Sequence, residues 1–160
     1  MSMSIREILS AVLSILALTL SVFTYLRGER MKKREDLRQF LSRTLYLSER
    51  IGRELLMTAV YFKEVTPDPE IAKRLYDIGV MTQIGELIEF DSRSGRWRDQ
   101  DFYLQFRSLV SCLKRLEDNC VALVREGYVA SEAEMMDLLK EASRTSREYD
   151  ETARARLLTL

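Results

Sequence analysis

Histidine is absent from the 160 residues, and the chain has only two cysteines, two prolines and six glycines. Without histidine it cannot form a Ser-His or Cys-His catalytic pair, a histidine-ligated zinc site or the Glu-x-x-His pairs of di-iron bundles. Few glycines and prolines leave few turns, which favours long helices over many short strands. The composition therefore predicts an all-α chain, and we expect no enzymatic activity.

Net charge is also absent, because 25 basic residues balance 25 acidic residues. Nucleic-acid binding depends on clustered positive charge, so we expect no nucleic-acid partner. The apolar fraction of 46% is sufficient for a packed core. We therefore expect a folded domain and not a disordered chain.

Charged residues are missing locally from residues 8–26. As a helix this run spans about 28 Å, which is close to the hydrocarbon thickness of a bilayer. A cleaved signal peptide is the alternative, but Phe23, Tyr25 and Leu26 lie where the small residues of a cleavage site are needed. We therefore predict a retained transmembrane helix over residues 8–26.

Basic residues are concentrated on one side of this run. Only Arg6 precedes it, whereas the residues that follow include Arg27, Arg30, Lys32, Lys33, Arg34 and Arg38. Because basic residues favour the cytoplasmic side, we predict a single-pass protein of the bacterial inner membrane. Residues 1–7 are then extracytoplasmic, 27–36 form a basic juxtamembrane segment, and 37–160 form a cytoplasmic helical domain.

The same basic residues are candidates for contact with anionic lipid headgroups. We assign this contact to Arg27, Arg30, Lys32, Lys33 and Arg34. The alternative is that they act as a topology signal alone, since acidic residues are interleaved with them.

Small residues recur within the run at alternating spacings of four and three: Ser10, Ser14, Ala17, Ser21 and Thr24. Small residues along one face allow two membrane helices to approach closely, so we predict a homodimer through this face. The alternative is that the hydroxyl groups bond to carbonyls of their own helix and face lipid.

Four further helix signals follow the membrane run. The first helix is predicted over 35–65, and the sequence leaves open whether it continues the membrane helix. Its apolar stripe is Leu37, Phe40, Leu41, Thr44, Leu47, Ile51, Leu55 and Phe62. The second helix is predicted to start at Asp68 and Pro69 and to continue to about Phe90. Its inward residues are Ile71, Leu75, Ile78, Ile84 and Ile88.

A loop is predicted at 91–96, and the third helix follows it. Its apolar seam is Phe102, Phe106, Leu109, Leu113, Leu116, Cys120 and Leu123, an unbroken alternation of four and three. Gly127 is the predicted end of this helix, and Ser131 with Glu134 forms a capping box that opens the fourth helix. The apolar face of the fourth helix is Met135, Leu138, Leu139, Ala142, Tyr149, Ala153 and Leu157.

Short connections between these helices predict an antiparallel four-helix bundle. The alternative is that the seam of the third helix pairs with a second chain as a coiled coil. Cys112 and Cys120 lie eight residues apart on one helix, which is too far for a disulfide, so we interpret both as core residues. In this topology the loop after the second helix returns to the membrane. Membrane-surface contact is therefore also predicted for Arg93, Arg96, Trp97 and Arg98.

Three short stretches carry a resemblance to a known family. They are Leu113-Lys114-Arg115-Leu116-Glu117, Val124-Arg125-Glu126-Gly127-Tyr128 and Leu138-Leu139. Together with the order of membrane run, basic segment and helices, they resemble a family of uncharacterised bacterial single-span membrane proteins. The family has Asn and an aromatic residue where this chain has Arg115 and Leu116. The resemblance implies a membrane location and a cytoplasmic helical domain, and it implies no activity.

Carboxylates are the remaining candidates for chemistry. Glu86, Glu89 and Asp91 lie close together and could hold a hard cation, but such density is ordinary on a solvated helix. We therefore predict no catalytic residue, no cofactor and no metal. The function that we expect is a membrane-tethered helical interaction or scaffold module with an unidentified protein partner. The alternative is a membrane-linked signalling or stress-response component.

Overall fold

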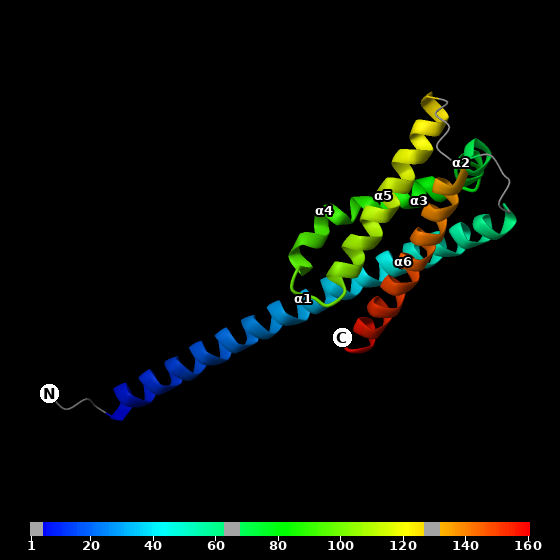
Figure 1. The fold of residues 1–160 in the computed structure, drawn as a ribbon. Coiled ribbons are helices and arrows are strands. Elements are labelled where there is room, and N and C mark those ends of the chain that lie inside the picture. Colours follow the sequence, from blue (N-terminus) through cyan, green and yellow to red (C-terminus); the bar gives the residue numbers. More distant parts are fainter. Residues whose placement is uncertain (1–4, 63–67, 127–131) are drawn as a thin grey trace. The chain divides into compact units, whose positions relative to one another are not determined.

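The computed structural model describes residues 5–62, 68–126 and 132–160. All secondary structure within these ranges is helical, which confirms the prediction of an all-α chain (Figure 1). The elements are α1 (Ile5–Tyr61), α2 (Asp68–Asp77), α3 (Val80–Glu89), α4 (Asp91–Ser94), the 3₁₀ helix η1 (Gly95–Trp97), α5 (Tyr103–Glu126) and α6 (Glu132–Leu158). The chain divides into two compact units, residues 1–40 and 41–160.

Helix α1 is a single helix of 57 residues that continues through the basic segment. This result answers the question that the sequence left open at residues 27–36. By length and composition α1 is also the one helix in the described part of the chain that could cross a membrane. Within the second unit it buries Leu41, Leu47, Ile51 and Leu55, as the stripe predicted.

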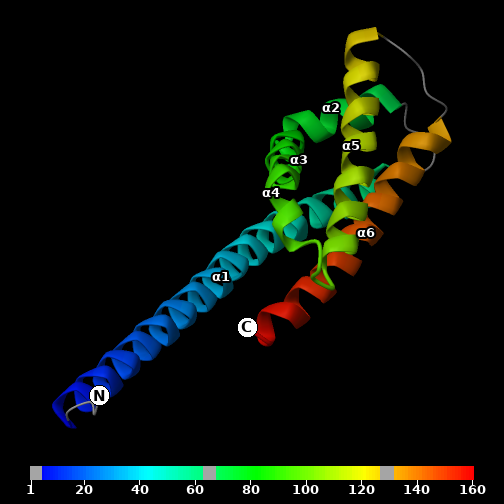
Figure 2. The same ribbon diagram turned by 90° about the vertical axis from the view of Figure 1, so that its left-hand side faces the viewer.

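The helix that we predicted over residues 69–90 is wrong as a single element. Helix α2 begins at Asp68 as expected but ends at Asp77, and α3 begins at Val80. Gly79 separates them with φ of 75°, a left-handed conformation that glycine adopts without steric cost. The two helices point in different directions (Figure 2).

The break also changes which residues face inward. Ile71, Leu75 and Ile84 are buried as predicted, but Ile78 and Ile88 are only half-buried. The apolar residues of α3 that reach the core are Val80, Met81, Ile84 and Leu87. A helix that restarts after Gly79 has a new phase, so the periodicity of α2 cannot be extended through it.

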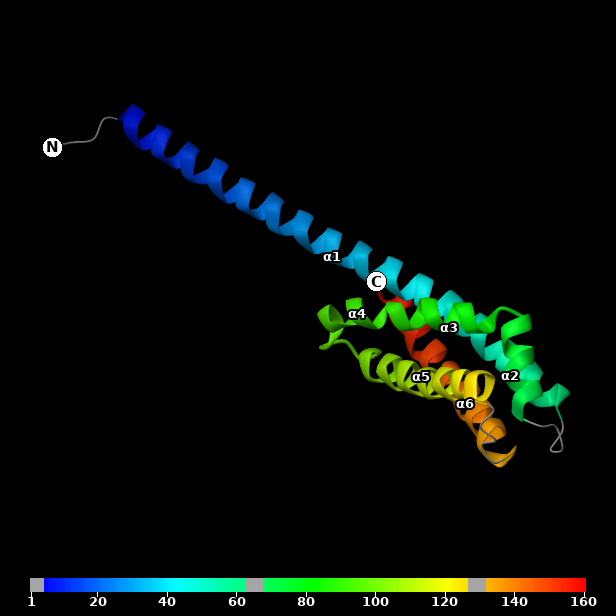
Figure 3. The same ribbon diagram turned by 90° about the horizontal axis from the view of Figure 1, so that it is seen from above.

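The loop predicted at 91–96 is also wrong, because this segment is helical. Helix α4 follows α3 directly and leads into η1 (Figure 3). The Ser94 hydroxyl donates to the Asp91 carbonyl oxygen at 2.8 Å, and Gly95 has right-handed dihedral angles of −56° and −25°. Ser94 and Gly95 therefore lie within consecutive helical turns and do not end the helix.

The third predicted helix corresponds to α5, and its complete seam from Phe102 to Leu123 is buried. Helix α5 packs against α2, α3 and α6 of the same chain. The seam is therefore part of the chain's own core. Cys112 and Cys120 are both buried in this core, which confirms their interpretation as core residues.

Helix α6 corresponds to the fourth predicted helix, and it runs antiparallel to α5. The Phe106 and Tyr149 rings pack at 5.5 Å, and Arg115 pairs with Glu141 at 3.3 Å. The predicted helix-ending Gly127 and the capping residue Ser131 lie outside the described residues.

Candidate functional site

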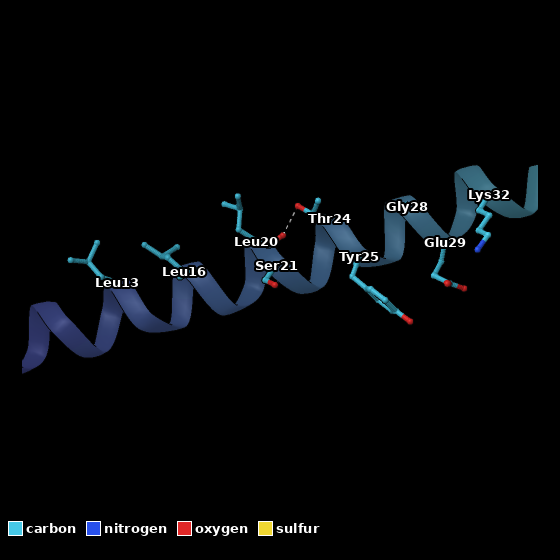
Figure 4. A pocket seen from close by; sticks show the side chains of 10 residues that line it. Leu13, Leu16, Leu20, Ser21, Thr24, Tyr25, Gly28, Glu29 and Lys32 are labelled. Atoms are coloured by element: carbon cyan, nitrogen blue, oxygen red, sulfur yellow. Dashed lines mark hydrogen bonds between the residues drawn. The ribbon is translucent and has the colours of Figure 1, made fainter.

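The uncharged run of α1 presents its side chains to the exterior. Every residue from Val12 to Leu26 is exposed, and the large apolar side chains among them are all at least half exposed. Leu13, Leu16 and Leu20 project from one side of the helix, and Ser21, Tyr25 and Glu29 project from another (Figure 4). Such continuous apolar exposure is unfavourable in water and is typical of a surface that another phase or protein covers.

The predicted small-residue face lies within this run, and the Ser14 and Thr24 hydroxyl groups on it bond to their own helix. The Ser14 hydroxyl donates to the Ser10 carbonyl oxygen at 2.9 Å, and the Thr24 hydroxyl donates to the Leu20 carbonyl oxygen at 2.8 Å. These bonds satisfy the Ser14 and Thr24 hydroxyl donors within α1.

The basic segment continues on the same helix. Arg27, Arg30, Lys32, Lys33 and Arg34 are all exposed. Their charged groups are therefore accessible to a ligand of opposite charge.

The second predicted basic group lies on α4, on η1 and directly after it. Arg93, Arg96 and Arg98 are exposed, and Trp97 is half-buried. The Arg96 guanidinium lies over the Trp97 ring at 5.8 Å, a cation–π contact. We call Arg93, Arg96, Trp97 and Arg98 the arginine–tryptophan cluster.

The C-terminal part of α6 approaches this cluster. The Arg156 guanidinium donates to the Gln100 side-chain oxygen at 2.7 Å. Two residues earlier, the Arg154 guanidinium pairs with the Glu49 carboxylate of α1 at 2.6 Å. The two arginines near the end of α6 are thus held by neighbouring elements of the same unit.

A buried polar contact joins the second half of α1 to α6, and the sequence did not predict it. The Thr44 hydroxyl and the Tyr149 phenol lie 2.5 Å apart, and the Ser48 and Ser146 hydroxyls lie 2.8 Å apart. The Ser146 hydroxyl also bonds to the Ser48 carbonyl oxygen at 2.7 Å. Because higher numbers on α1 meet lower numbers on α6, the two helices are antiparallel here.

Gly52 lies at the next turn of this contact. Its carbonyl oxygen accepts a bond from the Ser143 hydroxyl at 3.4 Å. A Cβ atom at position 52 would lie only 2.6 Å from the Ser146 Oγ. We call Thr44, Ser48, Gly52, Ser143, Ser146 and Tyr149 the polar seam.

Two ionisable groups lie at this seam. Burial raises the pKa of Tyr149 above its usual range, although its bond with Thr44 opposes the rise. Burial also raises the pKa of Asp150 to about 6. Glu49 and Glu151 raise it further, whereas Ser48 and Arg154 lower it. The Oδ1 atom of Asp150 is buried without a hydrogen-bond partner among the described residues.

Two of the three carboxylates that could have held a cation, Glu86 and Asp91, are engaged by arginines. Glu86 pairs with Arg43 at 2.8 Å, and Asp91 pairs with Arg107. In the three described ranges, no group of three or more His, Cys, Asp or Glu side chains is arranged to hold a metal ion. Burial raises the pKa of the Cys112 thiol, which disfavours the reactive thiolate.

The sequence did not lead us to predict four residues of the polar seam, which are Ser48, Gly52, Ser143 and Ser146. A signal was present, because Thr44, Ser48 and Gly52 are small residues spaced by four within an otherwise apolar stripe. That spacing places them on one helix face and permits a close approach of a second helix.

Comparison of the chain with protein-family models, with curated proteins and with solved structures found no match. The function proposed below therefore depends on the residues and contacts described above.

Proposed function

We propose that this chain is a membrane-tethered helical interaction module. Residues 8–26 anchor it in a bacterial inner membrane, and residues 37–160 form a cytoplasmic antiparallel four-helix bundle. The carrying observation is the continuous exposure of apolar side chains from Val12 to Leu26 on a helix long enough to cross a bilayer. The basic residues that follow favour the cytoplasm for the second unit.

We prefer an interaction role to catalysis because the polar side chains that could carry chemistry form ion pairs and hydrogen bonds within the chain. The Glu86 and Asp91 carboxylates are paired with arginines. The hydroxyl groups of the polar seam are bonded across α1 and α6. Both sets stabilise the helical unit, which leaves the exposed surfaces as the parts that contact partners.

Membrane extraction tests the tether. The full chain is expected to remain in the membrane pellet after a carbonate wash. Leu16→Arg with Leu20→Arg is expected to release it, because each charge near the membrane centre costs about 2.5–3.5 kcal/mol. Ser42→Arg, at an exposed site on the same helix, is the matched control and should stay in the pellet. Release of the unaltered chain by carbonate would contradict the tether.

Orientation is tested separately by C-terminal reporter fusions. A fluorescent protein should be active at the C-terminus, and a phosphatase that requires export should be inactive. Neutral replacement of Arg27, Arg30, Lys32, Lys33 and Arg34 should weaken this bias. An active exported phosphatase on the unaltered chain would reverse the orientation.

Two basic groups are proposed to contact anionic headgroups. They are Arg27, Arg30, Lys32, Lys33 and Arg34, and the arginine–tryptophan cluster. Each arginine or lysine near an anionic surface contributes about 1 kcal/mol, and Trp prefers the headgroup level.

The small-residue face is proposed to associate with a second copy within the membrane. Ser14→Leu with Ser21→Leu should weaken association in a membrane two-hybrid assay, because bulky side chains prevent close approach. Thr19→Leu makes a similar change on the opposite side of the helix and is the control. Unchanged association of the double variant would refute this contact.

A membrane-linked signalling component is the second candidate, and the polar seam favours it. Thr44, Ser48, Ser146 and Tyr149 form the contact between α6 and the helix that carries the anchor. Hydroxyl bonds can exchange partners, so this contact can have more than one arrangement. Hydrogen exchange of α6 should then change when the anchor is altered; identical exchange would argue against signalling.

A further inference from the structure

Asp150 is an acidic residue beside the polar seam between α1 and α6. It lies one turn after Ser146, whose hydroxyl bonds to the Ser48 hydroxyl of α1 at 2.8 Å. The Oδ1 atom of Asp150 is buried and has no hydrogen-bond partner among the described residues. Burying a polar atom without a partner costs free energy, and the cost is larger when the group is charged. The ionised carboxylate is therefore the unfavourable form of Asp150 at this contact.

One arginine lies between two carboxylates at this contact. Arg154 follows Asp150 by one helical turn, and its guanidinium donates to the Glu49 Oε1 of α1. The bond from Nε is 3.1 Å long, and the bond from Nη2 is 2.6 Å long. Both donor groups are used by Glu49, so Arg154 neutralises that carboxylate first. Asp150 keeps only a weaker attraction to the arginine, because the attraction between charges falls with distance.

The charges that act on Asp150 come from α1 and α6. Burial is the largest cause of the rise in its pKa to about 6. The carboxylates of Glu49 and Glu151 add to the rise, whereas the Ser48 hydroxyl and the Arg154 guanidinium oppose it. Among the described residues, no charged group of α2 or α5 is a cause of this change.

Tyr149 is the other titratable group of the seam. Burial raises the pKa of its phenol above the usual range, so the phenol stays neutral at physiological pH. Asp150 is therefore the group at this contact that changes its charge between pH 5 and 7.5.

We propose that Asp150, Glu49 and Arg154 form a proton-sensitive latch between α6 and α1. When the pH falls, Asp150 takes up a proton and loses its unpaired charge, while the ion pair of Glu49 and Arg154 remains. The contact between α1 and α6 then becomes tighter. When the pH rises, Asp150 releases the proton and the contact opens more often. The latch lies within residues 41–160, so it does not depend on the membrane tether.

Hydrogen exchange of α6 tests the latch. The full chain in detergent micelles is measured from pH 5 to 7.5, and each amide rate is corrected for the intrinsic pH dependence of exchange. The pKa of Asp150 is about 6 in the closed contact, and its ordinary value is 3.8. The opening equilibrium constant of residues 146–158 should therefore rise by up to about tenfold over this pH range.

Asp150→Asn separates the effect of the proton from the effect of packing. Asparagine has a similar size and does not titrate, so opening of α6 in this variant should not depend on pH. Glu151→Gln is the matched control, because it makes the same chemical change at the adjacent exposed position. That control should keep most of the pH dependence. Loss of the response in Glu151→Gln but not in Asp150→Asn, or a flat response in the unaltered chain, would overturn the latch.

Glu49→Gln tests the part of the arginine, and it decides the question if Asp150→Asn does not fold. Without the Glu49 carboxylate, Arg154 is available to pair with Asp150, and a nearby positive charge lowers the pKa of a carboxyl group. The midpoint of the pH response should then move to a lower pH. An unchanged midpoint, with the amides of α5 still protected, would overturn the latch.

Discussion

Gly52 is the position at which the packing of α1 on α6 can be tested most directly. Gly52→Ala adds one Cβ atom that would lie 2.6 Å from the Ser146 Oγ and 3.0 Å from the Ser146 Cβ. Ser146 is fully buried, and its hydroxyl bonds to both the Ser48 hydroxyl and the Ser48 carbonyl oxygen. Rotation of the serine away from the added Cβ atom would therefore break these two hydrogen bonds.

The expected loss of stability follows from three contributions. Overpacking of a close contact costs about 1–3 kcal/mol. Rotation of Ser146 away from the clash breaks two hydrogen bonds, each with a net contribution of about 1 kcal/mol. Alanine in a helix interior regains about 1 kcal/mol over glycine. Together these contributions predict that Gly52→Ala lowers the free energy of unfolding by about 2–4 kcal/mol.

Urea unfolding of the full chain in detergent micelles measures this change, with Trp97 fluorescence as the signal from the second unit. Gly85→Ala is the matched control, because nothing lies within 4 Å of its added Cβ. That variant should raise the free energy of unfolding by about 0.5–1 kcal/mol.

A second variant identifies the atom responsible. Gly52→Ala with Ser146→Ala removes the oxygen at 2.6 Å and should recover part of the loss. If Gly52→Ala and Gly85→Ala shift stability in the same direction, the close approach of α1 and α6 is refuted.

Three further predictions concern other parts of the second unit. Gly79→Ala should destabilise by about 1 kcal/mol in the same urea assay, since Gly79 has φ of 75°; no loss would show that the left-handed turn is not required. Burial raises the pKa of Asp150 from 3.8 to about 6, so the folded state binds the carboxyl proton more tightly than the unfolded state does. The protonated carboxyl therefore adds to the free energy of unfolding below pH 4, and this contribution is lost as the pH rises towards 6. Asp150→Asn should remove that part of the pH dependence and be more stable than the unaltered chain at pH 7. If the free energies of unfolding of the two chains change in parallel from pH 4 to 7, this prediction is contradicted. Trp97 fluorescence should shift to the blue when the full chain moves from zwitterionic to anionic nanodiscs at low salt, and an identical spectrum would count against lipid contact.

Helix content was predictable from the sequence because the apolar spacing and the uncharged run are local patterns. The seam from Phe102 to Leu123 repeats over three heptads, and the whole seam is buried in the structure. The break at Gly79 was not predicted, because glycine within a helical pattern is compatible either with an unbroken helix or with a left-handed turn. Packing of α2 and α3 on α5 decides between the two.

The segment 91–97 shows the opposite error. Asp, Ser and Gly favour loops by composition, yet Ser94 bonds to the Asp91 carbonyl oxygen and Asp91 pairs with Arg107 of α5. The ion pair comes from a residue 16 positions later in the chain. No local pattern contains that contact, so propensity alone gave the wrong element.

The polar seam was not predicted because its residues are neutral in a helical pattern and become informative only when two helices meet. In the structure these residues meet between α1 and α6. A buried Leu contributes about 1.5–3 kcal/mol, whereas a hydroxyl hydrogen bond contributes about 0.5–1.5 kcal/mol. The contact of α6 with α5 includes the Phe106 and Tyr149 rings, and its contact with α1 includes the Thr44–Tyr149 and Ser48–Ser146 hydroxyl pairs. Each of these hydroxyl pairs therefore stabilises the contact with α1 by less than a buried Leu side chain would.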